Sequence, residues 1–275
     1  MDEHDLHTVR RAYARQLVGL LGVEDERLEN AFAAVPRERF LGSKPWHIRQ
    51  FPGGSVPLPT NDPVYVYQNV LIALDPKRGV NNGSPSLHAR MMQALGPKPG
   101  DVVAHIGAGS GYYSAILAEL VRPEGSIISV EFDQALAEQA RATLSAWPNV
   151  EVVHGDGATW PKAAVDGIYV NFAVGRPASP WMDNLLPGGR LVFPLGVSDD
   201  LKRPGPQFAK GVVLRVEKAL GPHPASVVGP ASFVFAEGEA FQQELALLRH
   251  SKEAGSRLYD HLHGASQRMH ASAGI

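Results

Sequence analysis

The sequence predicts an α/β fold, in which helices cover both faces of a parallel β-sheet. Two observations lead to this prediction. Short apolar stretches alternate with helical stretches from residue 84 to residue 195, and the apolar stretches are too uniformly hydrophobic to leave one face in water. With 44% hydrophobic residues in a chain of 275, the sequence can also bury a full core.

The N-terminal region is expected to be helical and then irregular. Apolar residues recur at three- and four-residue spacing over the first forty residues, which predicts helices. The segment 40–80 carries many glycines, prolines and aromatic residues, so we expect a long loop with short strands, one of them over 64–74. A helix should follow, because Ser84 and Pro85 suit its start and Gly96 suits its end.

Beyond this helix, strands and helices alternate regularly. We expect three regions: an N-terminal region of residues 1–83, a core of residues 84–197, and a C-terminal region of residues 198–275 whose strands and helix pack on the core. The last dozen residues are expected to be frayed. Strands are expected at 101–106, 126–132, 150–154, 167–172, 190–195, 211–216 and 232–235, and helices at 112–121, 134–146, about 180–186 and along 241–262.

Charge and composition argue against several classes of protein. The chain has 26 basic and 28 acidic residues, which gives no overall field that would attract nucleic acid or an anionic membrane. No apolar run approaches the roughly 20 residues that span a bilayer, and the acidic start does not resemble a secretion signal. The absence of cysteine fits a cytoplasmic location. No metal site is expected, because His261 and His263 would lie on different faces of a helix.

The strongest functional signal is a glycine-rich turn between the first core strand and its helix. Glycines at alternate positions let the backbone turn sharply and let a ligand approach main-chain N–H groups, so we expect a nucleotide-like ligand. A dinucleotide is disfavoured, because Tyr112 stands where its fingerprint needs a third glycine. The turn reads Gly107, Ala108, Gly109, Ser110, Gly111.

Two acidic residues strengthen the case for an adenosine ligand. Glu131 ends the second core strand, where a carboxylate can accept hydrogen bonds from both ribose hydroxyls. Asp156, between Gly155 and Gly157, follows the third strand and is placed to accept from an adenine amino group. Ligands of open α/β sheets bind at the carboxyl ends of the strands, so these signals converge on one crevice.

At these residues the sequence resembles the protein-L-isoaspartate O-methyltransferase family, over residues 20–196. AFAAVPRERFL is similar to the family's N-terminal signature, IGAGSGYYSAILAEL to its glycine loop and helix, and SVEFDQALAEQAR, VEVVHGDG and LLPGGRLVFPLG to later segments. The resemblance implies a Rossmann-like methyltransferase fold with helical N-terminal and C-terminal extensions. It implies S-adenosylmethionine as methyl donor, S-adenosylhomocysteine as product, and an aspartyl or isoaspartyl carboxylate of a protein or peptide as acceptor.

Four positions near the expected site depart from that family or leave alternatives open. The family carries a serine, regarded as important for catalysis, where this sequence has Gly83. Ser84 either caps the helix or replaces that serine, and His88, which aligns with a histidine of some members, is either structural or catalytic. His105 stands where an acidic residue usually helps to hold the cofactor's methionine end. Restoring serine at position 83 is expected to speed isoaspartyl methylation about ten- to hundredfold, provided that glycine is not there for its backbone angle.

The expected chemistry needs little from the protein beyond alignment. A carboxylate is already a nucleophile at neutral pH, so no general base is required. A phenol or amine acceptor would need a base, for which His88 or His105 are the candidates. The segment 40–80 is expected to form part of the acceptor pocket, because it is longer than a connection requires. Two alternatives stay open: a small metabolite or modified peptide as acceptor, or a noncatalytic cofactor-binding protein.

Overall fold

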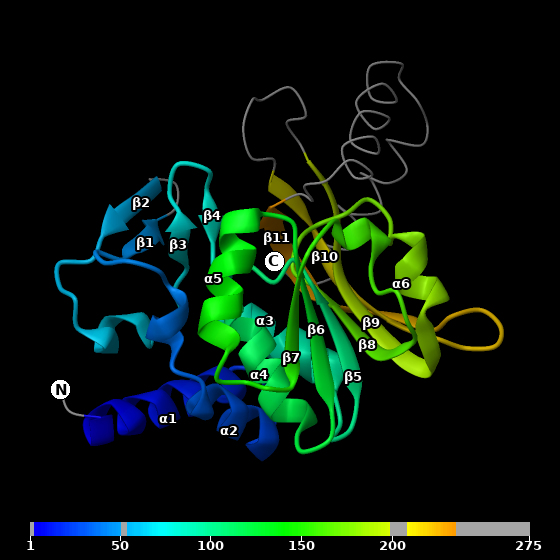
Figure 1. Ribbon diagram of the computed structural model, residues 1–275, viewed down its shortest axis with the longest axis horizontal. Helices are drawn as coiled ribbons and strands as arrows, with labels where there is room; N and C mark the ends of the chain where they lie inside the picture. The colour runs from blue at the N-terminus through cyan, green and yellow to red at the C-terminus, as the bar shows by residue number, and fades with distance from the viewer. Residues whose placement is uncertain (1–2, 51–53, 199–207, 235–275) are drawn as a thin grey trace.

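The computed structural model describes residues 3–50, 54–198 and 208–234 (Figure 1). Its main sheet has seven strands in the order β11-β10-β9-β8-β5-β6-β7. Strands β5 to β9 run parallel, while β10 and β11 are antiparallel additions at one edge. The strands are β5 (Val102–Ile106), β6 (Ser126–Glu131), β7 (Val150–His154), β8 (Val165–Val170), β9 (Leu185–Ser198), β10 (Phe208–Glu217) and β11 (Ala225–Val234).

The predicted α/β fold with a parallel sheet is confirmed. The strand β9 is much longer than the expected 190–195, because it pairs with β10 from Arg190 opposite Glu217 to Ser198 opposite Ala209. This antiparallel partner satisfies backbone groups that a short parallel strand would leave exposed. The three-region division at residues 83 and 197 stays a prediction, and the helix expected along 241–262 lies outside the described residues.

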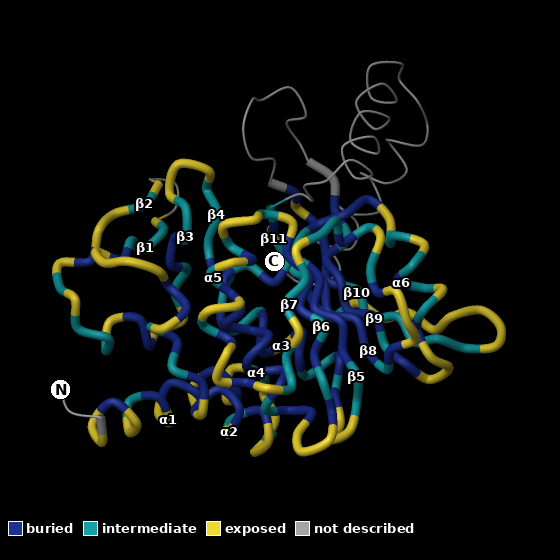
Figure 2. Tube along the Cα trace, in the orientation of Figure 1, coloured by how far each residue is buried: buried dark blue, intermediate teal, exposed yellow. Residues whose placement is uncertain are grey.

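Helices cover both faces of the main sheet. Figure 1 shows α3 (Pro85–Leu95), α4 (Tyr112–Val121) and α5 (Gln134–Leu144) on one side and the short α6 (Ser179–Asp183) on the other. The N-terminal helices α1 (Glu3–Gly19) and α2 (Glu26–Ala34) pack against each other and against α3 and α4. Burial is deepest along the central strands and α4 (Figure 2). Among the described residues, no helix has the length and apolar character needed to cross a bilayer.

The segment expected to be a long loop forms a second, smaller sheet. Its order is β2-β1-β3-β4, with all neighbours antiparallel. The expected strand over 64–74 is wrong except at 72–74, where β3 begins. This stretch starts instead with a 3-10 turn, η2 (Pro63–Val66), which Asp62 caps by accepting from the N–H of Val64. The strands are β1 (His47–Gln50), β2 (Gly54–Pro57), β3 (Ile72–Asp75) and β4 (Val80–Asn81).

A fully buried arginine holds this segment against the helices. Arg37 lies in the short 3-10 turn η1 (Arg37–Phe40) and has no exposed surface. Its guanidinium donates to the carbonyls of Val66 at 2.6 Å, Gln68 at 2.8 Å and Val70 at 2.7 Å. Three carbonyls outside the strands accept from this one side chain, and the Gln68 carbonyl also accepts from the N–H of Val70, so Arg37 helps to fix the path of residues 66–70.

Candidate active site

The glycine turn joins β5 to α4 and adopts backbone angles that favour glycine. Gly107, Gly109 and Gly111 have φ of 79°, 57° and 92°. A Cβ at Gly107 would lie 2.6 Å from Phe172, and one at Gly111 would lie 2.7 Å from Leu144. At Gly109 the nearest atom would be 3.8 Å away. Two of the glycines therefore permit close packing, and the middle one leaves open space beside the turn.

The carboxylate of Glu131 is fixed against this turn. Its Oε2 accepts from the N–H of Gly109 at 2.7 Å, and its Oε1 accepts from the N–H of Asp133 at 2.9 Å. The side chain is only 8% exposed, and burial raises the pKa of its carboxyl group, although these N–H groups act in the opposite direction. A carboxylate that has lost most of its water favours a ligand that donates hydrogen bonds.

A cavity of about 130 Å³ opens beside the turn and is called the turn cavity here. Of the residues expected to bind a ligand, Gly107, Gly109, Glu131, Gly155 and Gly157 line it. The cavity also has lining residues that the sequence patterns did not indicate. Two of these residues directly follow the strand β8, and one follows β6. These additional lining residues are Phe132, Asn171 and Phe172 at the strand ends, with Arg78, Val80, Asn81, Val130, Asp133, Leu136 and Val234.

The other expected ligand residues do not line this cavity. Asp156 uses its Oδ1 to accept from the N–H of Ala158 at 2.9 Å, so it caps a short turn. His105 is fully buried, its Nδ1 lies 2.7 Å from the Ser114 hydroxyl, and burial lowers its pKa to about 3. Ala108, Ser110 and Gly111 lie in the turn itself. Ligand contacts by the side chains of Asp156 and His105 stay predictions.

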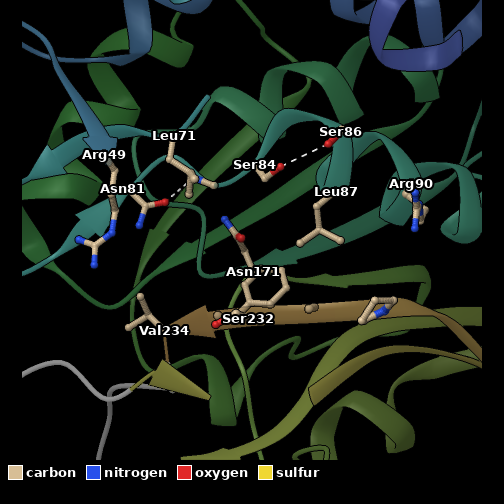
Figure 3. Close-up of a pocket in the computed structure, with 14 residues that line it drawn as sticks. Arg49, Leu71, Asn81, Ser84, Ser86, Leu87, Arg90, Asn171, Ser232 and Val234 are labelled. Carbon is tan, nitrogen blue, oxygen red and sulfur yellow. Dashed lines mark hydrogen bonds between the residues drawn. The ribbon is translucent and has the colours of Figure 1, made fainter. Parts of the chain in front are cut away.

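A larger cavity of about 440 Å³ adjoins the turn cavity and is called the serine cavity here (Figure 3). The two cavities share three wall residues, Asn81, Asn171 and Val234. Among the described residues, no acidic side chain lines the serine cavity, which includes two arginines and three serines. The remaining lining residues are Arg49, Leu71, Gly83, Ser84, Ser86, Leu87, Arg90, Pro230, Ala231, Ser232 and Phe233. The segment 40–80 and β11 thus reach this cavity from distant stretches of the chain.

Comparison with known proteins decides the family. The family model of protein-L-isoaspartate(D-aspartate) O-methyltransferases matches residues 15–211, well over half of the chain. The chain belongs to this family. The resemblance noted in the sequence is therefore confirmed, and it extends further than the expected 20–196.

Individual relatives and solved structures agree with this assignment. A protein of Aeropyrum pernix named protein-L-isoaspartate O-methyltransferase is 37% identical over 64% of this chain and 63% of its own length, so the match spans just under two thirds of that relative. A protein of the same name from Methanothrix thermoacetophila is 31% identical over 80% of this chain and 96% of its length. A solved structure titled protein-L-isoaspartate O-methyltransferase has a TM-score of 0.64 at 26% identity, covering 82% of this chain and 66% of that one.

A second solved structure supports the fold. It is a Plasmodium falciparum protein described as a putative protein-L-isoaspartate O-methyltransferase in complex with S-adenosyl-L-homocysteine. Its TM-score is 0.60 at 16% identity, over 84% of this chain and 99% of that one. The predicted Rossmann-like methyltransferase fold is confirmed by these neighbours.

The helix-start serine of this family member does not cap its helix with its side chain. Ser84 stands at the cap position of α3, but within the described residues its hydroxyl makes no capping hydrogen bond. The N–H of Ser86 is bonded instead by the side-chain oxygen of Asn69 at 3.0 Å. The Ser84 hydroxyl lies 3.3 Å from that of Ser86, and both line the serine cavity (Figure 3). Ser84 is thus available to contact a ligand in that cavity, and its catalytic role stays a prediction.

The volume of the family's missing serine is taken by a histidine. Gly83 has a φ of 72°, and a Cβ added there would lie 2.2 Å from Nε2 of His88. His88 is fully buried, stacks on Tyr113 with 3.6 Å between ring centres, and places Nδ1 2.5 Å from the Tyr169 hydroxyl. Burial lowers the pKa of His88 well below its usual value, so the ring is neutral. Gly83 is therefore needed for its positive φ and for the space that His88 fills. Replacing it by serine is no longer expected to speed isoaspartyl methylation.

An ion pair links the small sheet to the core in the lining of the turn cavity. Arg78, in the turn between β3 and β4, pairs with Asp133 at the start of α5. The hydrogen bond from the N–H of Leu136 holds the pKa of the Asp133 carboxyl below its usual value, and Arg78 acts in the same direction. Both Arg78 and Asp133 line the turn cavity, so a ligand in that cavity would lie close to this contact.

Proposed function

We propose that the chain transfers a methyl group from S-adenosylmethionine to the free carboxylate of an isoaspartyl residue in a protein or peptide. The observation that carries this proposal is the shared wall of the two cavities. A ligand at the glycine turn and a ligand in the serine cavity would meet at Asn81, Asn171 and Val234. Methyl transfer requires this kind of adjacency, since holding the reacting groups in line supplies most of the catalysis.

The residues of the turn cavity suit S-adenosylmethionine. Glu131 keeps acceptor capacity for a ribose hydroxyl, because its two oxygens offer about four lone-pair sites and backbone N–H groups such as those of Gly109 and Asp133 do not use all of them. Phe132 is 44% exposed and lines the cavity, so its ring offers a flat apolar surface to a base. When bound, the cofactor supplies a methyl group on a sulfonium centre. A cavity of about 130 Å³ is small for the whole cofactor, so its binding would require the contact between Arg78 and Asp133 to open.

The serine cavity suits a carboxylate acceptor. Arginines and hydroxyl groups line it, and its described lining includes no carboxylate and no imidazole. Arginine and hydroxyl donors stabilise and orient an anionic acceptor. A phenol or amine acceptor would need a base, whereas His88 and His105 are both buried in the core and line neither cavity.

The direct test uses radiolabelled methyl donor with matched peptides. An isoaspartyl peptide should accept the label as a base-labile ester, and the same peptide with ordinary aspartate should not. Small-metabolite extract and cell peptides serve as competing acceptors. Binding of S-adenosylhomocysteine without transfer to the isoaspartyl peptide would favour another acceptor or a noncatalytic protein.

Replacing Glu131 by glutamine should weaken the binding of S-adenosylhomocysteine about 5- to 150-fold. This corresponds to about 1–3 kcal/mol, the range for losing hydrogen bonds to a charged group. Calorimetry measures the dissociation constant. Glu138→Gln, an equal change at an exposed position of α5, is the control and should bind normally. Unchanged affinity in Glu131→Gln would remove this carboxylate from the site.

Replacing Arg78 by alanine should raise the dissociation rate of S-adenosylhomocysteine by up to about fivefold. The factor is modest because an exposed ion pair contributes about 0.2–1 kcal/mol. Arg122→Ala is a matched control, since the side chains of Arg78 and Arg122 are 43% and 45% exposed and both pair with a carboxylate. Stopped-flow displacement measures the rate. Equal rates in Arg78→Ala and the unaltered protein would show that the ion pair does not retain the ligand.

A further inference from the structure

We infer that the serine cavity selects acceptors that carry a second carboxylate close to the one that is methylated, and that Arg90 binds this second carboxylate. The inference rests on the proposed function for the identity of the first carboxylate. The substrate class is an isoaspartyl peptide with an acidic residue next to the isoaspartate. Arg90 would then be a residue that determines specificity.

The two arginines of the serine cavity come from different elements. Arg49 lies on β1, where its N–H bonds the carbonyl of Leu71 at 2.9 Å. Arg90 lies on α3, one turn beyond Ser86. Figure 3 shows them at opposite ends of the drawn residues, with Leu87 and Asn171 between them. Because the two arginines lie apart in this view, we assign each of them its own ligand position.

The side chain of Arg90 is directed over the strand β11. A Cβ added at Gly229 would lie 3.0 Å from Nη1 of Arg90 and 3.7 Å from its Cδ. The strand is irregular at this point, where the pairing of β10 with β11 shifts register after Val213. The missing side chain at Gly229 therefore makes room for the arginine side chain beside Pro230, which lines the cavity together with Arg90.

The electrostatics of the cavity favour a ligand with two negative charges. Two guanidinium groups line it, and no aspartate or glutamate is among its described lining residues. Arginine stays protonated at any physiological pH and matches a carboxylate with two parallel hydrogen bonds. A single methyl-accepting carboxylate would reach only one of these guanidinium groups. A neighbouring aspartate or glutamate in the acceptor peptide supplies the second negative charge at a distance of one residue.

The test compares two isoaspartyl peptides that differ only in the neighbouring residue, glutamate or glutamine. Calorimetry in the presence of S-adenosylhomocysteine gives the affinity of each peptide, and kcat/KM is measured with the methyl donor. The unaltered protein should bind the glutamate peptide about five- to tenfold more tightly, the scale of one partly exposed charge pair. Arg90→Gln should reduce this ratio to near one. Arg15→Gln, an exposed change on α1, should preserve the ratio.

The outcomes separate this inference from the proposed activity. A glutamate preference that Arg90→Gln abolishes, without methyl transfer to either peptide, would support the inference and refute the activity. Methyl transfer to both peptides, with equal affinity for the two, would support the activity and refute the inference. Arg90→Lys keeps the charge and should retain part of the preference, which distinguishes lost charge from a disturbed fold. A preference that survives in Arg90→Gln, or no binding of either peptide, overturns the inference.

Discussion

Replacing Arg37 by methionine should lower the free energy of unfolding by about 3–5 kcal/mol. Methionine keeps an apolar stem of similar length but removes the guanidinium, so the carbonyls of Val66 and Val70 lose their donor, while the Gln68 carbonyl keeps the N–H of Val70. Each buried acceptor that is left unsatisfied costs about 1–3 kcal/mol, and part of this is offset because a buried charge is also removed. Urea unfolding monitored by circular dichroism measures the change.

The neighbouring Arg39 provides the control for this prediction. It lies in the same 3-10 turn but is exposed, so Arg39→Met should change the free energy of unfolding by less than about 0.5 kcal/mol. The small sheet should be affected first in Arg37→Met, because the guanidinium fixes the segment leading into β3. Hydrogen exchange should therefore speed up over residues 66–75. A loss of less than about 1 kcal/mol in Arg37→Met would show that water satisfies these carbonyls.

Replacing Gly83 by serine should lower the free energy of unfolding by about 2–5 kcal/mol, although serine is the residue of the family pattern. A positive φ costs a residue with a Cβ about 1–2 kcal/mol, and overpacking adds about 1–3 kcal/mol. The overpacking arises because His88 cannot move aside: it stacks on Tyr113 and bonds Tyr169. Isoaspartyl methylation should fall, since Gly83 and Ser84 line the same cavity.

Two further variants separate the backbone cost of the positive φ from the cost of overpacking against His88. Gly22 has a φ of 70°, close to the 72° of Gly83, and a Cβ there would meet nothing within 4 Å. Gly22→Ser should therefore show the backbone cost alone, about 1–2 kcal/mol. In a His88→Ala background, Gly83→Ser should cost less than in the unaltered protein, which a double-mutant cycle detects. Equal costs in both backgrounds, or a Gly83→Ser protein that is as stable as the parent, would contradict the steric explanation.

Local signals in the sequence sufficed for the parallel core. The periodicity and the glycine punctuation placed β5 to β8 and the helices between them within a few residues, because each of these elements is buried by its own chain neighbours. The limits of β9 and β11 were missed. Their lengths are set by pairing with β10, and such pairing between strands leaves no mark in the alternation of a single segment. The 3-10 turn at Pro63 was missed although its signal is local, since Asp62 caps it and Pro63 begins it.

The candidate site was predictable where it lies at the carboxyl ends of the parallel strands, because ligands of open α/β sheets bind there. Gly107, Gly109 and Glu131 line the turn cavity as expected, and the same rule applied to the fourth strand would have found Asn171 and Phe172. Arg49 and Val234 could not be found in this way, because they come from the small sheet and from an edge strand added to the core. The contact between His88 and Gly83 could not be predicted either, because it depends on three-dimensional packing.

The wall shared by the two cavities also bears on the order in which the protein acquires its site during synthesis. Asn81 belongs to β4, Asn171 follows β8, and Val234 ends β11, so the wall joins segments that leave the ribosome at different times. A nascent chain that has emerged only as far as β9 can assemble the glycine turn, since β5, β6 and β8 are then complete. It still lacks Val234, and with it one side of both cavities. Both cavities can therefore be completed only after β11 has been synthesised and has paired with β10.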